Sequence, residues 1–422
     1  MGSGRGHETI ITGNLTNCGL GRPRASARAG AAPAAASRYG ADVKVLVVSV
    51  PLGGHISPLV PIIRALVAGG DDVVVATGAE AAPIVERTGA RLAVAGSGVG
   101  PVWERLAQRT RGHPGDGIAP ERINHYFIPR VFGEIVVDDM IDGVLAAGET
   151  LRPDLVLFEA HSLAGPLAAE LLGVPGVTHM VGPQLDPEIF ELANDAVSPI
   201  WRMFGRDVPG AAGLHRDITV QVCPPTLERR PLPGGRGLAM RPVPLPATPP
   251  VATPRPLVYV TFGTFFSTNL EPFRVVLDAL AGEPVDVVVT VGEQQDPAGL
   301  APFPANARVE RFIPQAELLP STAVVVHHGG AGTTFGALAH GLPQLIIPQG
   351  ADNFEHAAIC EAAGTSLSLR PGDVSPEAIA RAVRRLLDEP SFAAASQRVA
   401  MEIAAMPDAA EVAATLRTRF AP

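Results

Sequence analysis

Short apolar runs recur along the first half of the chain and alternate with stretches of helical periodicity. They are continuous rather than alternating, as expected for parallel strands buried on both faces. The runs are Lys44–Val50, Asp72–Ala76, Ala90–Ala95, Leu155–Phe158 and Val177–Met180. Between the first two, apolar residues repeat at helical spacing at Ile56, Leu59, Ile62, Ile63 and Leu66. The alternation predicts strand–helix–strand units in a parallel sheet.

The second half of the chain repeats this pattern. Its apolar runs are Leu257–Phe262, Val285–Val291, Ala323–Val326 and Leu345–Ile347. Helical periodicity covers residues 272–281 and then Glu355–Ala363, Pro376–Leu387 and Phe392–Met406. A second α/β unit is therefore predicted.

A proline-rich stretch separates the two halves. Prolines crowd the residues from Pro224 to Pro256, which excludes regular helix or a central strand there. A chain of 422 residues also favours two domains. We predict an N-terminal extension outside the fold at residues 1–41, a first domain at 42–235, a linker at 236–256, a second domain at 257–405 and a terminal helix at 406–422.

Composition excludes several classes of protein. The formal net charge of −9 argues against a nucleic-acid partner, because phosphate backbones require a basic face. No apolar run reaches the length of a membrane span. Cys18, Cys223 and Cys360 are too far apart for a paired metal motif, and residues 1–41 lack the apolar core of a secretory signal. These features favour a cytoplasmic enzyme or binding protein.

One glycine-rich turn carries the clearest sign of ligand binding. Gly329, Gly330 and Gly332 follow the strand at Ala323–Val326, and a helix is predicted to begin near Thr333. The free N–H groups and the dipole of that helix start suit a diphosphate. His327 and His328, with Thr333 and Thr334, add side-chain donors. Such turns also occur in doubly wound folds that bind nothing there.

A second strand end lies next to this turn in the sequence. The strand at Leu345–Ile347 is followed by Gln349, Asp352 and Asn353, and ligands bind at the carboxyl ends of strands in open α/β sheets. The two motifs, HHGGAGTT and GLPQLIIPQGADNFEHA, resemble the nucleotide-sugar signature of family 1 glycosyltransferases. Among these, the chain most resembles bacterial antibiotic glycosyltransferases that use dTDP-deoxysugars, from about Lys44 to its end.

The resemblance implies a GT-B fold, with two Rossmann-like domains facing across a cleft and the last helix crossing back to the first domain. It also implies binding residues. Those for the nucleotide and its phosphates are Thr264, Phe312, Ile313, His328, Gly330, Ala331, Gly332 and Thr333, and those for the sugar are Gln349, Asp352 and Asn353. Phe312 would stack on the base, although an aromatic residue there also suits the core.

The catalytic base of the resembled family lies at the Gly-Gly-His turn after the first strand. In this chain that residue is His55, which follows Gly53 and Gly54. A carboxylate at the end of the fourth predicted strand orients the base in the family, where it is commonly Asp. Here it is Glu159, which either orients His55 or has a nonessential role in the pocket.

The acceptor side is less well defined. Residues Gly96–Pro120 lack periodicity, and Arg122–Leu145 returns to a helical pattern. The candidates for an acceptor pocket are Trp103, Phe127, Phe132, Phe190 and Trp201. The last two lie in Pro187–Phe204, where aromatic residues suit a core as well as an acceptor wall.

The leading hypothesis is therefore an inverting transfer of a sugar from dTDP to a hydroxyl of a natural-product aglycone. No DxD-like motif stands by the phosphate turn, so the resemblance and the helix dipole predict a metal-independent reaction without a cofactor. The alternatives are a UDP-sugar donor with a small hydrophobic acceptor, a sugar-nucleotide epimerase and a non-catalytic nucleotide-sugar binding protein. A dinucleotide-dependent oxidoreductase is disfavoured because no GxGxxG follows Val50. The sequence leaves open a homodimer or an auxiliary protein.

Overall fold

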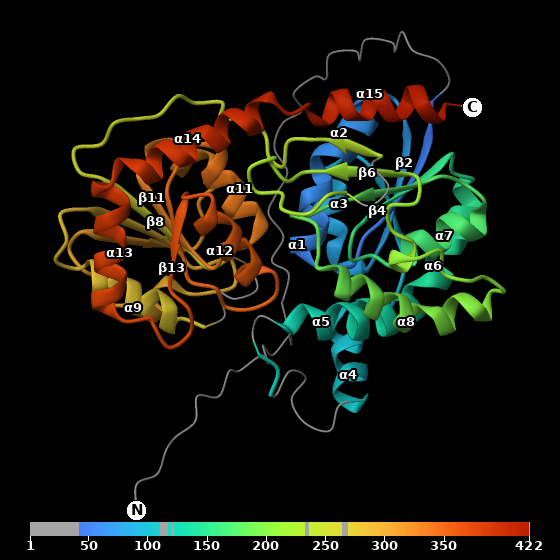
Figure 1. The fold of residues 1–422 in the computed structure, drawn as a ribbon, viewed down its shortest axis with the longest axis horizontal. Coiled ribbons are helices and arrows are strands. Elements are labelled where there is room, and N and C mark those ends of the chain that lie inside the picture. Colours follow the sequence, from blue (N-terminus) through green and yellow to red (C-terminus); the bar gives the residue numbers. More distant parts are fainter. Residues whose placement is uncertain (1–41, 110–116, 120–121, 233–235, 264–268, 422) are drawn as a thin grey trace, which may run out of the picture. The chain divides into compact units, whose positions relative to one another are not determined.

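The computed structural model describes residues 42–109, 117–119, 122–232, 236–263 and 269–421. The predicted extension at residues 1–41 and the candidate Thr264 lie outside the described residues. Within the described part, two parallel sheets account for the strands (Figure 1). This confirms the predicted fold of two Rossmann-like units.

The first sheet has the strand order β3-β2-β1-β4-β5-β6-β7, and every neighbouring pair is parallel. Its strands are β1 (Lys44–Val48), β2 (Asp72–Thr77), β3 (Arg91–Val94), β4 (Leu155–Glu159), β5 (Gly176–His179), β6 (Ile218–Gln221) and β7 (Gly237–Ala239). β1 and β4 are buried on both faces, as their continuous apolar runs predict.

The second sheet has the order β10-β9-β8-β11-β12-β13, again with parallel pairs. Its strands are β8 (Leu257–Thr261), β9 (Asp286–Thr290), β10 (Ala307–Glu310), β11 (Val324–His327), β12 (Gln344–Ile346) and β13 (Ser366–Ser368).

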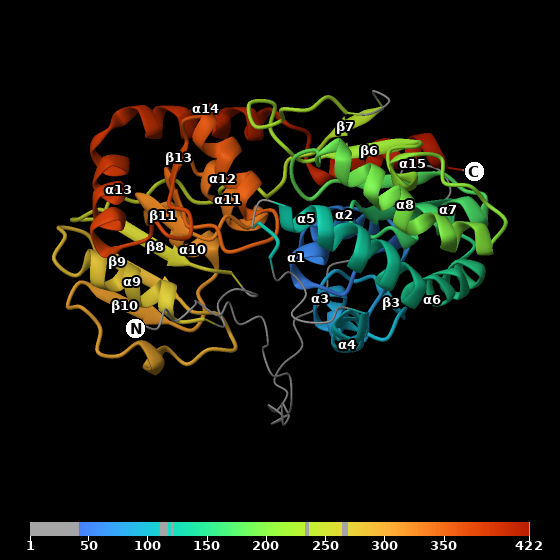
Figure 2. The ribbon, with the colours of Figure 1, turned by 60° about the horizontal axis from the view of Figure 1, so that its bottom comes forward.

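Helices cover both faces of the first sheet. On one face they are α4 (Val99–Arg109), α5 (Ile123–Phe127), a π-helix (Ile128–Ile135), α6 (Val136–Leu151), α7 (Ala164–Leu172) and α8 (Pro187–Met203). Figure 2 shows α6, α7 and α8 gathered on one side of the molecule. The other face carries α1 (Gly53–Ile56), α2 (Val60–Ala68) and α3 (Ala82–Glu86). Each set buries a separate apolar core against the sheet.

The second sheet is covered in the same way. One face packs against α9 (Glu271–Leu280) and α13 (Pro376–Asp388). The helices outside that core are α10 (Gln315–Leu318), α11 (Ala331–Ala339) and α12 (Asn353–Ala362), while α14 (Pro390–Ala405) adds Phe392 to it and packs its later residues with α11 and α12. The short 3-10 turns are Ser57–Leu59, Ala79–Ala81, Ala211–Gly213, Pro297–Leu300 and Leu319–Ser321.

The last helix, α15 (Ala409–Phe420), belongs to the core of the first domain. Val412, Ala413 and Leu416 are buried there beside α2 (Figure 1). The guanidinium of Arg417 lies 2.7 Å from the carboxylate of Asp71, which is buried. The predicted crossing of the terminal helix back to the first domain is thus confirmed.

In each sheet the strand order reverses at one point, which is called the switch point. In the first sheet the chain runs outward from β1 to β3 and returns with β4 on the other side of β1. In the second sheet the corresponding neighbours are β8 and β11. Ligands bind outside the carboxyl ends of strands at such switch points. His55 and Glu159 lie at the first switch point, and the turn of Gly329 and Gly330 lies at the second.

The structure differs from the sequence prediction at several elements, among them the short strands β6, β10 and β13, which no predicted apolar run covers. Residues predicted to lack periodicity include α4, a helix whose Val102 and Leu106 are buried. Gly98, Gly100 and Pro101 near its start concealed this pattern. The stretch predicted as linker begins with β7, which pairs with β6 and extends the first sheet. No helix of the described residues has the length and apolar character needed to cross a membrane.

Candidate active site

His55 occupies the turn that joins β1 to the first helices. It lies in α1, four residues long, which begins two residues before it at Gly53. Because β1 pairs with β4 up to Val48 and Phe158, this turn lies beside the end of β4. The His55 side chain is 20% exposed, and its Nδ1 lies 3.3 Å from Oε1 of Glu159. The predicted base and its carboxylate are therefore neighbours.

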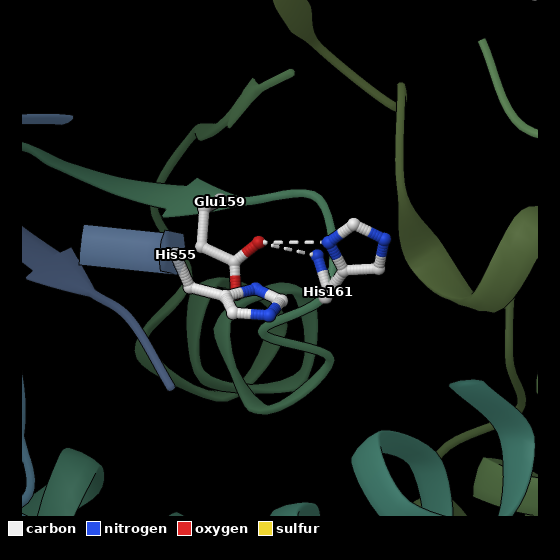
Figure 3. A group of neighbouring side chains, drawn as sticks. All are labelled: His55, Glu159 and His161. Atoms are coloured by element: carbon white, nitrogen blue, oxygen red, sulfur yellow. Dashed lines mark hydrogen bonds and ion pairs between the residues drawn. The ribbon is translucent and has the colours of Figure 1, made fainter. Parts of the chain in front are cut away.

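Glu159 is fully buried and surrounded by donors. Besides His55, its Oε2 accepts a hydrogen bond from the backbone N–H of His161 at 2.7 Å and lies 3.3 Å from the Nδ1 of the same residue. Its Oε1 accepts from the hydroxyl of Ser162 at 3.1 Å. Figure 3 shows Glu159 between the two imidazole rings, with the outer nitrogen of each ring turned away from the carboxylate.

This surrounding keeps the carboxylate ionised. Burial alone would raise the pKa of Glu159, but the charge of His55 and the contacts from His161 and His55 outweigh it and hold the pKa well below its ordinary value. Burial also tends to lower the pKa of His161, yet the contact with Glu159, its charge and that of Asp352 raise it. An ionised carboxylate facing Nδ1 keeps the proton on that atom, so Nε2 of His55 is left as the acceptor.

His161 and Ser162 were not predicted as members of this site. Their signal in the sequence is their spacing, two and three residues after the carboxylate at the end of β4, where a tight turn brings them back to it. One ring nitrogen of His55, one of His161 and one carboxylate oxygen of Glu159 lie within 4.8 Å of one another, a spacing that a metal ion could also use. A second such group in the described residues is His125, Asp186 and Glu188.

Aromatic side chains adjoin the histidines. The ring of Phe132, in the π-helix, lies 5.2 Å from the ring of His55 and 5.7 Å from that of His161. Trp103 and Phe127 form an edge contact at 5.7 Å and are partly buried. These three sites suit the acceptor assignment, which stays a prediction.

The other two candidates for the acceptor pocket lie in the core. Trp201 is 1% exposed and Phe190 is 8% exposed, and both pack in the apolar cluster under the first sheet. The interpretation of these two as an acceptor wall is corrected, because a side chain enclosed by core residues presents no surface to an aglycone.

The glycine-rich turn presents the start of α11 and the ring of His328. α11 begins at Ala331 after Gly330, without a side-chain cap, so its first N–H groups are available to an anion. A Cβ on Gly263 would lie 2.7 Å from the His328 ring, and one on Gly330 would lie 2.5 Å from it. His328 therefore lies between the turn after β8 and the turn before α11. Burial lowers the pKa of His328 to about 4, which makes the imidazole a neutral donor at pH 7.

The two histidines of the motif have different environments. Nδ1 of His327 accepts from the N–H of Gly329 at 3.0 Å, and its Nε2 lies 2.7 Å from Oε1 of Gln344. This fixes the tautomer with the proton on Nε2. His327 is fully buried and holds the turn, so it does not share the phosphate role considered for the pair.

The threonines that follow also differ. The hydroxyl of Thr334 donates to the carbonyl of Gly330. The hydroxyl of Thr333 accepts from the amide of Gln315 at 3.0 Å, which leaves its proton to be donated elsewhere. Gly332 is exposed, with open space where a Cβ would be. Thr333, Gly332, Ala331 and Gly330 thus surround the start of α11, where the sequence placed them.

The predicted sugar residues lie in the loop between β12 and α12. The side-chain oxygen of Asn353 accepts from the backbone N–H groups of Gln349 and Gly350, and its amide donates to Asp352. Gln349 donates to the carbonyl of Ile347. Asp352 is only partly buried. Asn353 therefore shapes the loop and orients Asp352, while the sugar contacts of all three residues stay a prediction.

Phe312 is 58% exposed, in the loop after β10. The alternative of Phe312 as a core residue is therefore wrong, and its ring has a face available for stacking. Ile313 next to it is partly buried. Their contact with a base stays a prediction.

The chain matches known proteins along most of its length. Residues 122–244 match the N-terminal domain and residues 274–418 the C-terminal domain of the family described as erythromycin biosynthesis protein CIII-like. The L-demethylnoviosyl transferase of Streptomyces niveus is 34% identical over 88% of this chain and 97% of its own length. The elloramycin glycosyltransferase ElmGT of Streptomyces olivaceus is 30% identical over 90% and 98%.

Solved structures agree with these relatives. The glycosyltransferase SsfS6 of Streptomyces sp. SF2575, complexed with thymidine diphosphate, superposes with a TM-score of 0.73 at 29% identity, covering 89% of this chain and 99% of its own. The family match covers more than half of the chain, and the predicted GT-B fold is confirmed. The chain belongs to the erythromycin biosynthesis protein CIII-like family and is a glycosyltransferase that uses a nucleotide sugar.

Proposed function

We propose that this enzyme transfers a deoxysugar from dTDP to a hydroxyl group of a natural-product aglycone with inversion, and that His55 is the general base. The observation that carries the proposal is the contact of 3.3 Å between Nδ1 of His55 and the buried, ionised Glu159. It leaves Nε2 of a partly exposed imidazole as a proton acceptor at the switch point of the first sheet.

The reaction is a single displacement. Nε2 of His55 takes the proton of the acceptor hydroxyl while the oxygen forms a bond to the anomeric carbon. The bond from that carbon to the diphosphate breaks on the opposite face, and the diphosphate leaves with the electron pair. Glu159 stabilises the imidazolium that forms, because its charge faces Nδ1.

The glycine-rich turn at Gly329 and Gly330, with the start of α11, forms the phosphate turn, and it supplies the positive field for the leaving group. The N–H groups at the start of α11, the hydroxyl of Thr333 and the ring of His328 are the donors near the diphosphate. Donors already fixed in place stabilise developing charge without reorganisation. We therefore propose that transfer proceeds without a metal ion. The thymidine diphosphate complex of SsfS6 supports dTDP over UDP as the carrier.

The aromatic residues beside the base fit a hydrophobic acceptor. Phe132 lies against His55, and the pair of Trp103 and Phe127 lies in neighbouring helices on the same face of the sheet. Flat rings of this kind bind apolar aglycones through contact area. The named activities of the relatives, such as demethylnoviosyl and elloramycin glycosyl transfer, support an antibiotic-like aglycone. The contact of His55 with Glu159 disfavours a non-catalytic binding protein.

The proposal is tested by incubating the enzyme in EDTA with dTDP-deoxysugars, matched UDP-sugars and a panel of polyketide aglycones. Mass spectrometry is expected to detect glycosides from the dTDP donors, and NMR to show an inverted anomeric centre. If products formed only from UDP-sugars, the nucleotide carrier would be UDP and not dTDP. Retention of configuration, or activity only after magnesium is restored, would overturn the corresponding part of the proposal.

Asp352 provides a separate test of the sugar site. We expect Asp352→Ala to lower turnover of the dTDP-sugar while the affinity for free dTDP changes little, because the carboxylate accepts from sugar hydroxyls rather than from the nucleotide. One hydrogen bond to a charged group is worth about 1.5–3 kcal/mol, or roughly 10-fold to 150-fold in kcat/KM. Steady-state kinetics and calorimetry with dTDP separate the two effects. An equal loss in both would show that Asp352 shapes the nucleotide site instead.

A further inference from the structure

A second histidine, His161, lies against Glu159, and the proposed mechanism does not use it. Each oxygen of the carboxylate faces one imidazole Nδ1 at 3.3 Å, His55 on Oε1 and His161 on Oε2. The two rings meet at an angle of 85° with their centroids 5.1 Å apart (Figure 3). A proton added to either ring therefore acts on the other ring directly and through the carboxylate that they share.

The two histidines are not equivalent. The His161 side chain is 10% exposed and that of His55 is 20% exposed. His161 is also tied to Glu159 twice, through its ring and through its backbone N–H at 2.7 Å. His161 also lines a small hollow together with Asp352, Glu355 and His356. His161 is thus the more enclosed of the two and the more firmly tied to Glu159, and His55 is the better placed to meet an acceptor.

We propose that His161 is a positioning residue for the base: it fixes the far oxygen of Glu159 so that the near oxygen faces His55, and when it is protonated it limits how strongly His55 holds a proton. This inference rests on the proposed function, in which His55 is the base. If ionised Glu159 raised the proton affinity of His55 too far, His55 would already be protonated before the acceptor bound and could not act as the base.

Several charged groups surround this pair. Within the described residues, Glu159 faces His161 from β4 and His55 faces it from α1. Asp352 and Glu355 line the same hollow as His161, and the charge of Asp352 contributes to the raised pKa of His161. His356 in the same hollow donates from Nδ1 to the carbonyl of Gly329 at 2.6 Å. Burial lowers the pKa of His179, next to Glu159 on β5, to about 4, so it stays neutral above pH 5.

The proposal predicts the direction in which the proton affinity of His55 changes when His161 is replaced. Replacing His161 with a neutral residue removes the charge that a protonated His161 places beside His55, with the ring centroids 5.1 Å apart, and leaves the charge of Glu159 to His55 alone. A nearby charge at this range moves a pKa by about one unit or more. His161→Gln keeps an N–H donor for Glu159, so it separates the effect of the charge from the loss of the contact. The pKa of His55 is expected to rise.

The test is an NMR titration of the imidazole nitrogens in the full-length enzyme labelled at histidine. In His161→Gln the titration midpoint of His55 is expected to rise by about one pH unit, and the acid limb of kcat/KM to move by the same amount. A matched control is His125→Gln, which removes a histidine 3.6 Å from Glu188 and is expected to leave the His55 midpoint in place. A midpoint of His55 that stays unchanged or falls in His161→Gln would overturn the inference.

A second measurement does not depend on any variant folding. In the wild-type enzyme, His161 is expected to titrate above the ordinary histidine value of about 6.5. A lower midpoint would also overturn the inference. The proposed function fails in a different way: if the His55 midpoint rises but the acid limb of kcat/KM does not follow, His161 still tunes His55, and the base of the reaction is another residue.

Discussion

His55→Ala is expected to lower kcat by about 10²–10⁴-fold, the range that general base catalysis supplies. Two imidazoles lie against Glu159 in the described residues, and the substitution removes the more exposed of them. The affinity for dTDP should stay close to that of wild type, because the phosphate turn lies on the other sheet. Steady-state kinetics with a purified aglycone and calorimetry with dTDP measure the two quantities.

Glu159→Gln is the matched control for this result. The amide keeps an oxygen that accepts from His55 but removes the charge that stabilises the imidazolium. The loss in kcat should therefore be smaller than for His55→Ala. If Glu159→Gln instead cost as much as His55→Ala while the fold was retained, the charge of Glu159 and not the proton transfer to His55 would limit the rate.

His328→Ala is expected to weaken the binding of dTDP by roughly 10-fold to 150-fold, which corresponds to the loss of a hydrogen bond to a charged group worth about 1.5–3 kcal/mol. The ring lies against Gly263 and Gly330, at the two turns that meet at the switch point of the second sheet. Because burial lowers its pKa to about 4, His328 enters the complex as a neutral donor, and a diphosphate beside it would raise that pKa.

His328→Gln provides the control, since its amide also donates an N–H and should restore part of the affinity. Calorimetry with dTDP, supported by a melting curve for each variant, separates binding from stability. An affinity within twofold of wild type in His328→Ala would mean that the N–H groups of α11 hold the diphosphate without the ring. His327 offers no alternative, because both of its ring nitrogens are engaged with Gly329 and Gln344.

Continuous apolar runs made the strands predictable. Parallel strands buried on both faces require such runs, so β1, β4, β8 and β11 appeared in the sequence close to their final bounds. The placement of His55 and Glu159 at neighbouring strand ends also followed, because the carboxyl ends of parallel strands meet at one edge. Local pattern and tertiary position agree at these residues.

Elements and contacts that depend on packing were harder to predict. Trp201 and Phe190 suited an acceptor wall as well as a core, and only the packing of α8 on the first sheet decides between them. α4 begins among glycines and a proline, which hide its amphipathic pattern. The role of His161 depends on a turn after β4 that returns its ring and backbone to Glu159. Such a return is a tertiary contact that spacing alone does not specify.

The central claim is that His55 accepts the proton of the acceptor. The most direct test is to measure single-turnover rates of wild type and His55→Ala with two acceptors of similar shape, and to compare the ratio of the two rates between the acceptors. One carries an alkyl hydroxyl and the other a phenol. An alkyl hydroxyl needs a base most, so the ratio is expected to reach about 10²–10⁴ for it and to be much smaller for the phenol, which ionises readily. A His55→Ala enzyme that glycosylates the alkyl hydroxyl at nearly the wild-type rate would contradict the claim.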